Sequence, residues 1–323
     1  MFICENLCPI KRKIDFSDNR LVYPKETGEF PCYDQRMLLP PEPRFDDLDL
    51  PGTRLHTVKC GTGPPLIIVP ATVSLISQWL PLAQFMGQRF TAHFFELPGH
   101  GGSTPYPAKF NSGLVPKTVE ALADRLGYER FNLMGFSFGG LLALRTIESL
   151  QYRIDRVILL SPCVSQRALK YSMPRRWMFR ATARSLMWPR LQRGTHRVLQ
   201  THWLEFPLTF ALSKFSKVER SILESKDALK IPLATLDVLA YTLDEIFRME
   251  YRSACGPFDI PCYFGMSIND DLLRYALTEQ IVREHFPRIT IQKFTHPYHQ
   301  PPKPPTFEWL AQEFGPFLEM LDI

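Results

Sequence analysis

Short apolar runs alternate with longer amphipathic stretches over much of the chain. The apolar runs predict buried strands, and stretches with apolar side chains at helical spacing predict helices. The predicted strands are residues 55–59, 66–69, 91–97, 130–134, 156–160, 261–266 and 289–294. The predicted helices are residues 79–85, 117–126, 141–149, 277–286 and 306–321. This alternation predicts βαβ units and a largely parallel sheet, with a site at the carboxyl ends of its strands.

Residues 165–250 interrupt the alternation. They show no clear strand pattern, and prolines divide them into what we predict to be several short helices. These prolines are Pro174, Pro189, Pro207 and Pro232. The segment is rich in aromatic residues, of which we expect most to pack its own core and a few to cover an apolar pocket. They are Trp177, Phe179, Trp188, Trp203, Phe206, Phe210 and Phe215.

The first 50 residues show no sustained period. Their charges and prolines predict an extended arm that lies over the body of the protein. The predicted organisation is an N-terminal extension (1–50), the first part of an α/β core (51–164), a helical cap insert (165–252) and the second part of the core (253–323).

A serine between two glycines marks the junction of one predicted strand and helix. Gly135-x-Ser137-x-Gly139 lies where a sharp strand-to-helix turn is expected. The glycines remove Cβ atoms that would clash in so tight a bend. The turn would lift the Ser137 hydroxyl above the sheet edge and aim the first helical N–H groups at the group it attacks. Ser137 is therefore the candidate nucleophile.

Acid and base candidates follow two later strands, in the order that this topology requires. An activated serine needs a base to take its proton and a carboxylate to orient that base. The strand ending near residue 266 leads to Asp270 and Asp271, of which we prefer Asp270. The strand ending near residue 294 leads to His296 and His299. We prefer His296 because it follows its strand directly, with His299 as the alternate.

The oxyanion of an acyl-transfer reaction needs two backbone donors. The N–H of Phe138, next to the nucleophile, is one candidate. The second is expected from the loop after residues 66–69, where Thr72 is the first choice and Ala71 the next. His100 lies in a turn-rich loop before the nucleophile, and we expect it to have a structural role.

Charge is unevenly distributed along the chain of 323 residues, whose formal net charge is +5. Ten basic residues and no acidic ones occur from Arg156 to Trp203. Such a region could attract an anionic substrate or a membrane surface. A solvated helical face is the more common outcome, and we favour it. No nucleic-acid-binding motif accompanies the basic residues, and the sequence does not indicate an oligomeric state.

The remaining features predict a cytoplasmic protein without a metal or cofactor. No apolar run is long enough to span a bilayer, and residues 1–13 lack the apolar core of a signal peptide. The odd number and irregular spacing of the cysteines argue against a disulfide framework or a zinc site. They are Cys4, Cys8, Cys32, Cys60, Cys163, Cys255 and Cys262.

These residues resemble the α/β-hydrolase superfamily, in the branch of capped serine esterases, lipases and carbon–carbon bond hydrolases. The resemblance covers roughly residues 53–163 and 255–321. Its most specific parts are residues 96–103, similar to the family's Asp-x-Pro-Gly-x-Gly-x-Ser loop, and the turn at 135–140. It implies an α/β-hydrolase fold with a mostly parallel central sheet flanked by helices, and a helical cap at residues 165–250. It supports Ser137 as the nucleophile and excludes the relatives that use an aspartate there.

The chain departs from the family pattern at three places. Pro70-Ala71 stands for the usual His-Gly, Thr295 for the Gly before the histidine, and Glu96 for Asp. None of these changes removes a catalytic side chain, although Pro70 stiffens the oxyanion loop.

We therefore expect a serine hydrolase that acts on a small-molecule carboxylic ester with an apolar part. The alternatives are a carbon–carbon bond hydrolase or an acyltransferase with the same triad, and a non-catalytic binding protein on the same scaffold.

Overall fold

The computed structural model describes residues 39–200, 231–253, 256–301 and 303–321. Most of the expected N-terminal arm and the middle of the insert lie outside these residues. So do Cys4, Cys8, Cys32, Cys255, Trp203, Phe206, Pro207, Phe210 and Phe215. The described residues belong to one compact unit, residues 36–323.

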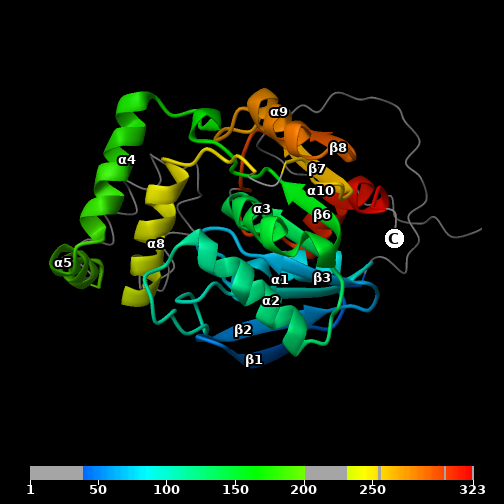
Figure 1. Cartoon of the computed structure of the whole chain (residues 1–323), viewed down its shortest axis with the longest axis horizontal. Coiled ribbons are helices and arrows are strands. Elements are labelled where there is room, and N and C mark those ends of the chain that lie inside the picture. The colour runs from blue at the N-terminus through cyan, green and yellow to red at the C-terminus, as the bar shows by residue number, and fades with distance from the viewer. Residues whose placement is uncertain (1–38, 201–230, 254–255, 302, 322–323) are drawn as a thin grey trace, which may run out of the picture. The chain divides into compact units, whose positions relative to one another are not determined.

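Eight strands in the described part of the chain form a single sheet in the order β1-β2-β4-β3-β5-β6-β7-β8 (Figure 1). The strands are β1 (Arg44–Leu50), β2 (Thr53–Cys60), β3 (Pro65–Val69), β4 (Thr91–Phe95), β5 (Phe131–Phe136), β6 (Ile154–Leu160), β7 (Cys262–Ser267) and β8 (Ile289–Phe294). All pairs from β4 to β8 are parallel, and β2 pairs antiparallel with both β1 and β4. The predicted α/β fold with a mostly parallel sheet is confirmed.

Helices cover both faces of this sheet. The helices outside the insert are α1 (Ile76–Met86), α2 (Val115–Arg125), α3 (Phe138–Leu150), α9 (Tyr275–His285) and α10 (Phe307–Glu319). Buried side chains of α2, α3 and α9 form one hydrophobic core against the sheet. Those of α1 and α10 form a second core on the opposite face. Two apolar faces are therefore buried, as expected for strands that are apolar on both sides.

Residues 44–50, expected as part of an extended arm, instead form the edge strand β1. Every residue of β1 pairs with β2, from Arg44 opposite Lys59 to Leu50 opposite Thr53. Only Leu48 of this strand is buried. Charged residues on an exposed edge discourage pairing with other chains, and they also hide the apolar alternation that would identify a strand.

Three described helices lie between β6 and β7, where the sequence predicts a helical insert. They are α4 (Met173–Leu186), α5 (Pro189–Leu199) and α8 (Leu233–Ile246), which stand together beside the sheet (Figure 1). Asp244 of α8 accepts hydrogen bonds from Arg180 at 3.1 Å and Arg184 at 3.0 Å, which join α4 to α8. Glu245 accepts hydrogen bonds from Arg145 of α3, at 2.9 Å, and from Ser112. Asp244 therefore joins two helices of the insert, and Glu245 ties the insert to the core.

Candidate active site

Ser137 occupies the turn between β5 and α3 in a strained conformation. Its φ and ψ are 53° and −120°, a combination that a residue with a side chain rarely adopts. The backbone around it holds this conformation. Ser137 N–H donates to the Leu160 carbonyl at 3.0 Å, and the Ser137 carbonyl accepts from Gly140 at 3.0 Å and Cys163 at 2.8 Å. The turn leaves the Ser137 side chain partly exposed.

The flanking glycines permit the close packing of this turn. A Cβ atom at Gly135 would lie 2.2 Å from the Gly139 carbonyl oxygen, and one at Gly139 would lie 2.5 Å from the Val69 carbonyl oxygen. Neither backbone position can move away without opening the turn. The sequence predicts that side chains at these two positions would clash, and the structure confirms it.

A hydrogen-bonded relay joins Ser137, His299 and Asp270. His299 Nε2 lies 2.8 Å from Ser137 Oγ, and His299 Nδ1 lies 2.7 Å from Asp270 Oδ2. Asp270 is an acceptor at neutral pH, so Nδ1 carries the proton and Nε2 accepts from the serine hydroxyl. The geometry is that of a nucleophile, a general base and an orienting carboxylate.

Asp270 stays ionised although it is fully buried. Burial raises the pKa of this carboxyl, but its hydrogen bond to the His299 ring and its backbone hydrogen bonds outweigh that effect and lower it. Asp270 Oδ1 also accepts from the backbone N–H groups of Leu272, at 2.9 Å, and Leu273, at 2.7 Å. These donors fix the carboxylate and hold its pKa below the usual value.

The expectation that His296 is the base is not met, because the structure places His299 at the serine. The two histidines follow β8, which is three strands away from β5 in the sheet. At a spacing of about 4.8 Å per strand, β8 is roughly 14 Å from β5. In the described residues the His296 ring makes no hydrogen bond to Ser137 or Asp270, and the loop through Pro297 and Tyr298 brings His299 to both.

His296 instead lies in an aromatic cluster. Its ring stacks on Tyr298, with centroids 4.7 Å apart, and on Phe294, at 5.7 Å. Its Nδ1 atom is buried without a hydrogen-bond partner among the described residues. Burial lowers the pKa of His296, opposed by the nearby Asp270 charge. The ring is therefore held mainly neutral near pH 7 and acts as part of an apolar wall.

Asp271, the alternate acid, contacts the backbone of His299. Its Oδ1 atom accepts from the backbone N–H of His299 at 2.8 Å. The preference for Asp270 as the partner of the imidazole matches the observed contact. The two adjacent aspartates thus contact the same histidine, one at its ring and one at its main chain.

The expected oxyanion donors differ in whether their N–H groups are already hydrogen-bonded. Phe138 is the first residue of α3, so its N–H has no acceptor within the helix and is available to a ligand. Ala71 N–H donates to Ser74 Oγ at 3.0 Å, which removes this alternate from consideration. Thr72, the first choice, is partly exposed and precedes Val73, whose φ is +51°. A positive φ at a β-branched residue is rare and indicates a loop held under strain.

Glu96 connects the loop that contains Thr72 to the glycine-rich loop at residues 98–103. The sequence did not reveal this role. Its carboxylate is buried and accepts from the N–H of Ile76 at 2.9 Å and of Gly102 at 2.6 Å. Ile76 begins α1, directly after the oxyanion loop. Both acceptor contacts are to backbone groups, which leave no side-chain pattern in the sequence.

Cys163 lies beside the nucleophile but is not a second one. Its Sγ is 3.7 Å from Ser137 Oγ, and the residue is almost completely buried. Burial raises the pKa of the Cys163 thiol to about 12, so it stays protonated at neutral pH. Because the thiolate is the reactive form of cysteine, the hydroxyl of Ser137 is the better nucleophile here.

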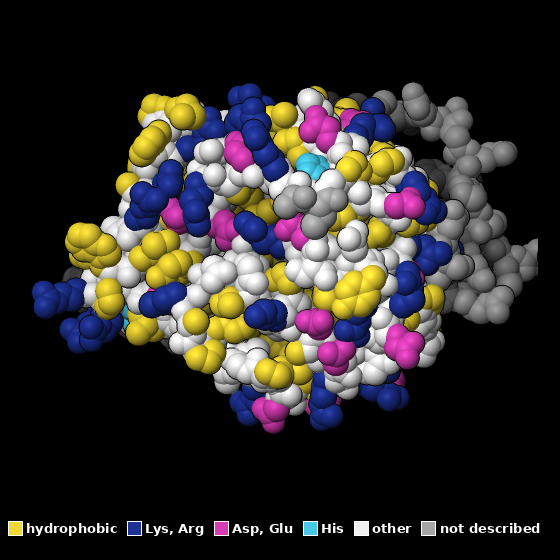
Figure 2. All heavy atoms as spheres, in the orientation of Figure 1, with side chains coloured by type: hydrophobic (Ala, Val, Ile, Leu, Met, Phe, Trp, Pro, Cys, Tyr) yellow, Lys and Arg dark blue, Asp and Glu magenta, His cyan; other side chains and the backbone are white. Residues whose placement is uncertain are grey.

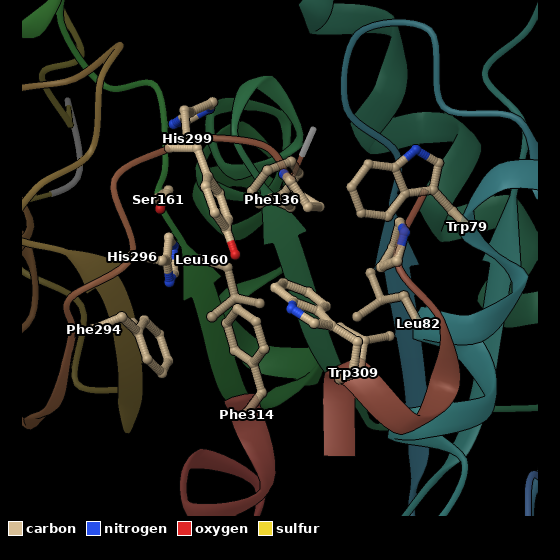
Figure 3. A pocket seen from close by; sticks show the side chains of 15 residues that line it. Trp79, Leu82, Phe136, Leu160, Ser161, Phe294, His296, His299, Trp309 and Phe314 are labelled. Atoms are coloured by element: carbon tan, nitrogen blue, oxygen red, sulfur yellow. The ribbon is translucent and has the colours of Figure 1, made fainter. Parts of the chain in front are cut away.

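An apolar cavity of about 40 Å³ adjoins His299 (Figure 3). Side chains from α1, α10, strand ends and the loop after β8 line it. Those labelled in Figure 3 are Trp79, Leu82, Phe136, Leu160, Ser161, Phe294, His296, His299, Trp309 and Phe314. Phe136 stacks on the His299 ring with centroids 5.4 Å apart. The cavity therefore begins at the edge of the relay and is narrow.

His100 is buried, and neither nitrogen of its ring has a hydrogen-bond partner among the described residues. Burial lowers its pKa to about 4, so the ring is neutral at physiological pH. This burial is consistent with the structural role that the sequence predicts for His100. In the described part of the chain, no cluster of His, Cys, Asp and Glu is arranged to hold a metal ion, and no helix is long and apolar enough to cross a bilayer.

Comparison with known proteins identifies relatives of this fold. Residues 64–235 match the family model described as "alpha/beta hydrolase fold". A pimeloyl-[acyl-carrier protein] methyl ester esterase of Nitrosomonas europaea is 30% identical over 116 residues, which cover 35% of this chain and 44% of the esterase. An N-formylmaleamate deformylase of Pseudomonas putida is 28% identical over 116 residues, covering 35% and 43% of the two chains. The matches span less than half the length of these curated relatives.

Solved structures match over most of their length. A hydrolase of Bacillus anthracis described as having an alpha/beta fold superposes with a TM-score of 0.63 at 18% identity, covering 86% of this chain and 98% of the other. A thermophilic esterase from Thermogutta terrifontis gives a TM-score of 0.61 at 18% identity, covering 85% and 98%. At this identity the likeness is one of fold.

Proposed function

Because the chain belongs to the alpha/beta hydrolase fold family, we propose that it is a serine hydrolase that cleaves a carboxylic ester with an apolar part. The relay of Ser137, His299 and Asp270, with contacts of 2.8 and 2.7 Å, carries this proposal. A damaged or purely structural serine would not need a buried histidine and carboxylate in line with its hydroxyl. This argues against a non-catalytic binding protein.

In the first half of the reaction, Ser137 Oγ attacks the ester carbonyl carbon. His299 Nε2 takes the hydroxyl proton as the new C–O bond forms, and Asp270 stabilises the resulting imidazolium. The imidazolium then gives this proton to the leaving alcohol oxygen as its bond to the carbonyl carbon breaks. The acyl group remains on Ser137.

In the second half, water takes the place of the alcohol. His299 removes a proton from the water molecule, whose oxygen attacks the acyl carbon. Collapse of the second tetrahedral intermediate breaks the bond to Ser137 Oγ, which recovers the proton from His299. In both halves the Phe138 N–H, with the Thr72 N–H as the proposed partner, would stabilise the negative oxygen.

The apolar cavity beside His299 supports an apolar group in the substrate. Its walls are aromatic and aliphatic, and it opens at the imidazole that must contact the scissile bond. A small cavity of this kind would accept a slim or short group, and the helical insert would act as the cap over the site. The esterase relatives act on a methyl ester by name, which is consistent with an ester substrate.

Amide and carbon–carbon bond cleavage are the second candidate reactions. The same relay can act on them, and the N-formylmaleamate deformylase is among the relatives. Acyl transfer to an acceptor other than water would need the same acyl-enzyme. These reactions differ in contacts to the leaving group and acceptor, not in the relay.

A location in the cytoplasm remains our expectation. The cysteines of the described residues, Cys60, Cys163 and Cys262, are unpaired and buried. Burial raises the pKa of the Cys60 thiol to about 11, and it also raises that of Cys262. Protonated, buried thiols suit a compartment in which cysteines stay reduced.

Steady-state kinetics of the wild type and Ser137→Ala test the proposal. The panel would contain p-nitrophenyl esters of increasing acyl length, matched anilides and a β-diketone. We expect ester turnover by the wild type and its loss in the variant, with an unchanged circular dichroism spectrum. Turnover of only the anilides would favour amide cleavage over ester hydrolysis. Turnover of only the diketone would favour carbon–carbon bond cleavage. Ester turnover that survives in Ser137→Ala would contradict the mechanism.

A further inference from the structure

The outer surface of α4 and α5 carries exposed apolar side chains among arginines. Figure 2 shows hydrophobic and basic side chains side by side over the end of the protein that these two helices form. Trp177 is 62% exposed and Trp188 is 69% exposed. Met173, Met178, Leu191 and Val198 are also large exposed apolar residues of this segment. A group of exposed tryptophans and methionines indicates a surface that binds another molecule or a membrane.

On α4, two of these side chains share one face of the helix. Met173 and Trp177 are four positions apart, so both project to the same side. The opposite side faces α8. There Ala183 is buried, and the Phe179 ring stacks on Phe247 with centroids 5.2 Å apart. The exposed apolar residues are therefore not the helix's packing face.

On α5, the usual positions of polar and apolar residues are inverted. Gln192 is buried and donates to Asp237 of α8 at 2.7 Å, whereas Leu191 and Val198, seven positions apart, are exposed. Beside this apolar strip lies a basic one, because Arg190, Arg193 and Arg197 recur every three or four positions. A helix that buries a glutamine and exposes an apolar strip beside a basic one fits a partner with both apolar and anionic groups.

The charged residues of α4 and α5 are all basic. No acidic residue occurs from Arg156 to the end of α5. Among the described residues, two acids of α8 pair with this region: Asp244 contacts Arg180, Arg184 and Arg248, and Asp237 contacts Gln192 and Lys109. The exposed arginines of α5 therefore present a positive potential next to apolar side chains.

We propose that the outer face of α4 and α5 binds the surface of an anionic lipid bilayer. Tryptophan combines an apolar ring with one polar N–H and is favoured at the boundary between headgroups and acyl chains. Arginines beside it would contact lipid phosphates and carboxylates, as in amphipathic helices that lie in the membrane plane. This arrangement would place the insert against the membrane, where an apolar ester could reach the site without crossing water.

Flotation of the purified full-length protein with lipid vesicles tests this proposal. One set of vesicles contains phosphatidylcholine alone, and the other contains phosphatidylcholine mixed with phosphatidylserine. We expect binding to the mixed vesicles that weakens as salt is raised. The variant Arg190→Gln/Arg193→Gln/Arg197→Gln should bind more weakly by about fivefold for each arginine, roughly a hundredfold in all.

The tryptophans supply a second measurement. Brominated lipids should quench the fluorescence of the wild type on mixed vesicles, and Trp177→Ser/Trp188→Ser should lose most of that quenching and bind weakly. Tyr152→Ser, which removes an aromatic residue 65% exposed on the α/β core, is the matched control and should bind as the wild type does. Absence of binding at low salt, equal binding to neutral vesicles, or unchanged binding of the tryptophan variant would each overturn the proposal. None of these measurements depends on hydrolase activity.

Discussion

The carboxylate of Asp271 accepts the backbone N–H of His299 at 2.8 Å. The loop after β7 therefore contacts the histidine twice, because the preceding residue, Asp270, accepts its ring N–H. A long loop after an edge strand would otherwise have considerable freedom. The paired aspartates restrict both the position of the backbone and the orientation of the ring.

Loss of the Asp271 contact should reduce catalysis. Asp271→Ala removes the acceptor, so we expect kcat/KM to fall by about tenfold through misplacement of the imidazole. Asp271→Asn keeps an oxygen at the same position and should restore most of the activity. Kinetics of the two variants with one ester distinguish these cases. Equal losses in both would show that the charge, and not the hydrogen bond, is what matters.

Glu96 should matter for stability as well as for activity. The glutamine of Glu96→Gln has one acceptor oxygen for two backbone donors, so one buried N–H loses its partner. We expect a loss of about 2 kcal/mol in the free energy of unfolding. Urea denaturation measures this change, and the exposed Glu129→Gln serves as the control. A difference below about 0.5 kcal/mol would mean that the two loops do not depend on this carboxylate.

Acid should destabilise the protein partly through His100. The folded-state pKa is lowered to about 4, below the usual value near 6.5, so between these values the unfolded chain binds a proton that the folded chain does not. Stability should therefore fall as pH decreases from 6.5 to 4, by up to about 3 kcal/mol for this residue. His100→Leu should show a smaller decrease over that range in denaturant titrations. An identical pH dependence in both proteins would exclude the contribution.

The cavity beside His299 should limit the size of the apolar group. Trp309 forms part of its wall (Figure 3), and Trp309→Ala should widen it. We expect the ratio of kcat/KM for a long acyl ester to that for a short one to rise by about tenfold, with a smaller rise in Trp309→Phe. Measurements across a series of chain lengths test this order. A ratio that is the same in all three proteins would place the acyl group elsewhere.

The sequence predicts most of the sheet and the nucleophile, because both depend on local patterns. Apolar runs identify β3 and β5, and Gly135 and Gly139 identify the turn that carries Ser137. The histidine was assigned wrongly because its distance from Ser137 depends on the order of strands, and sequence does not determine how far the loop after β8 must extend. The role of Glu96 in joining two loops is not predicted, because its partners are backbone N–H groups. The edge strand β1 was missed because its exposed positions are charged.

Labelling with a fluorophosphonate tests the central claim, that His299 activates Ser137. Intact-protein and peptide mass spectrometry would follow the adduct in the wild type, Ser137→Ala, His299→Ala and His296→Ala. We predict rapid labelling at Ser137 in the wild type and in His296→Ala, and labelling slowed by at least about a hundredfold in His299→Ala. Slow labelling in His296→Ala with normal labelling in His299→Ala would contradict the account and make His296 the base.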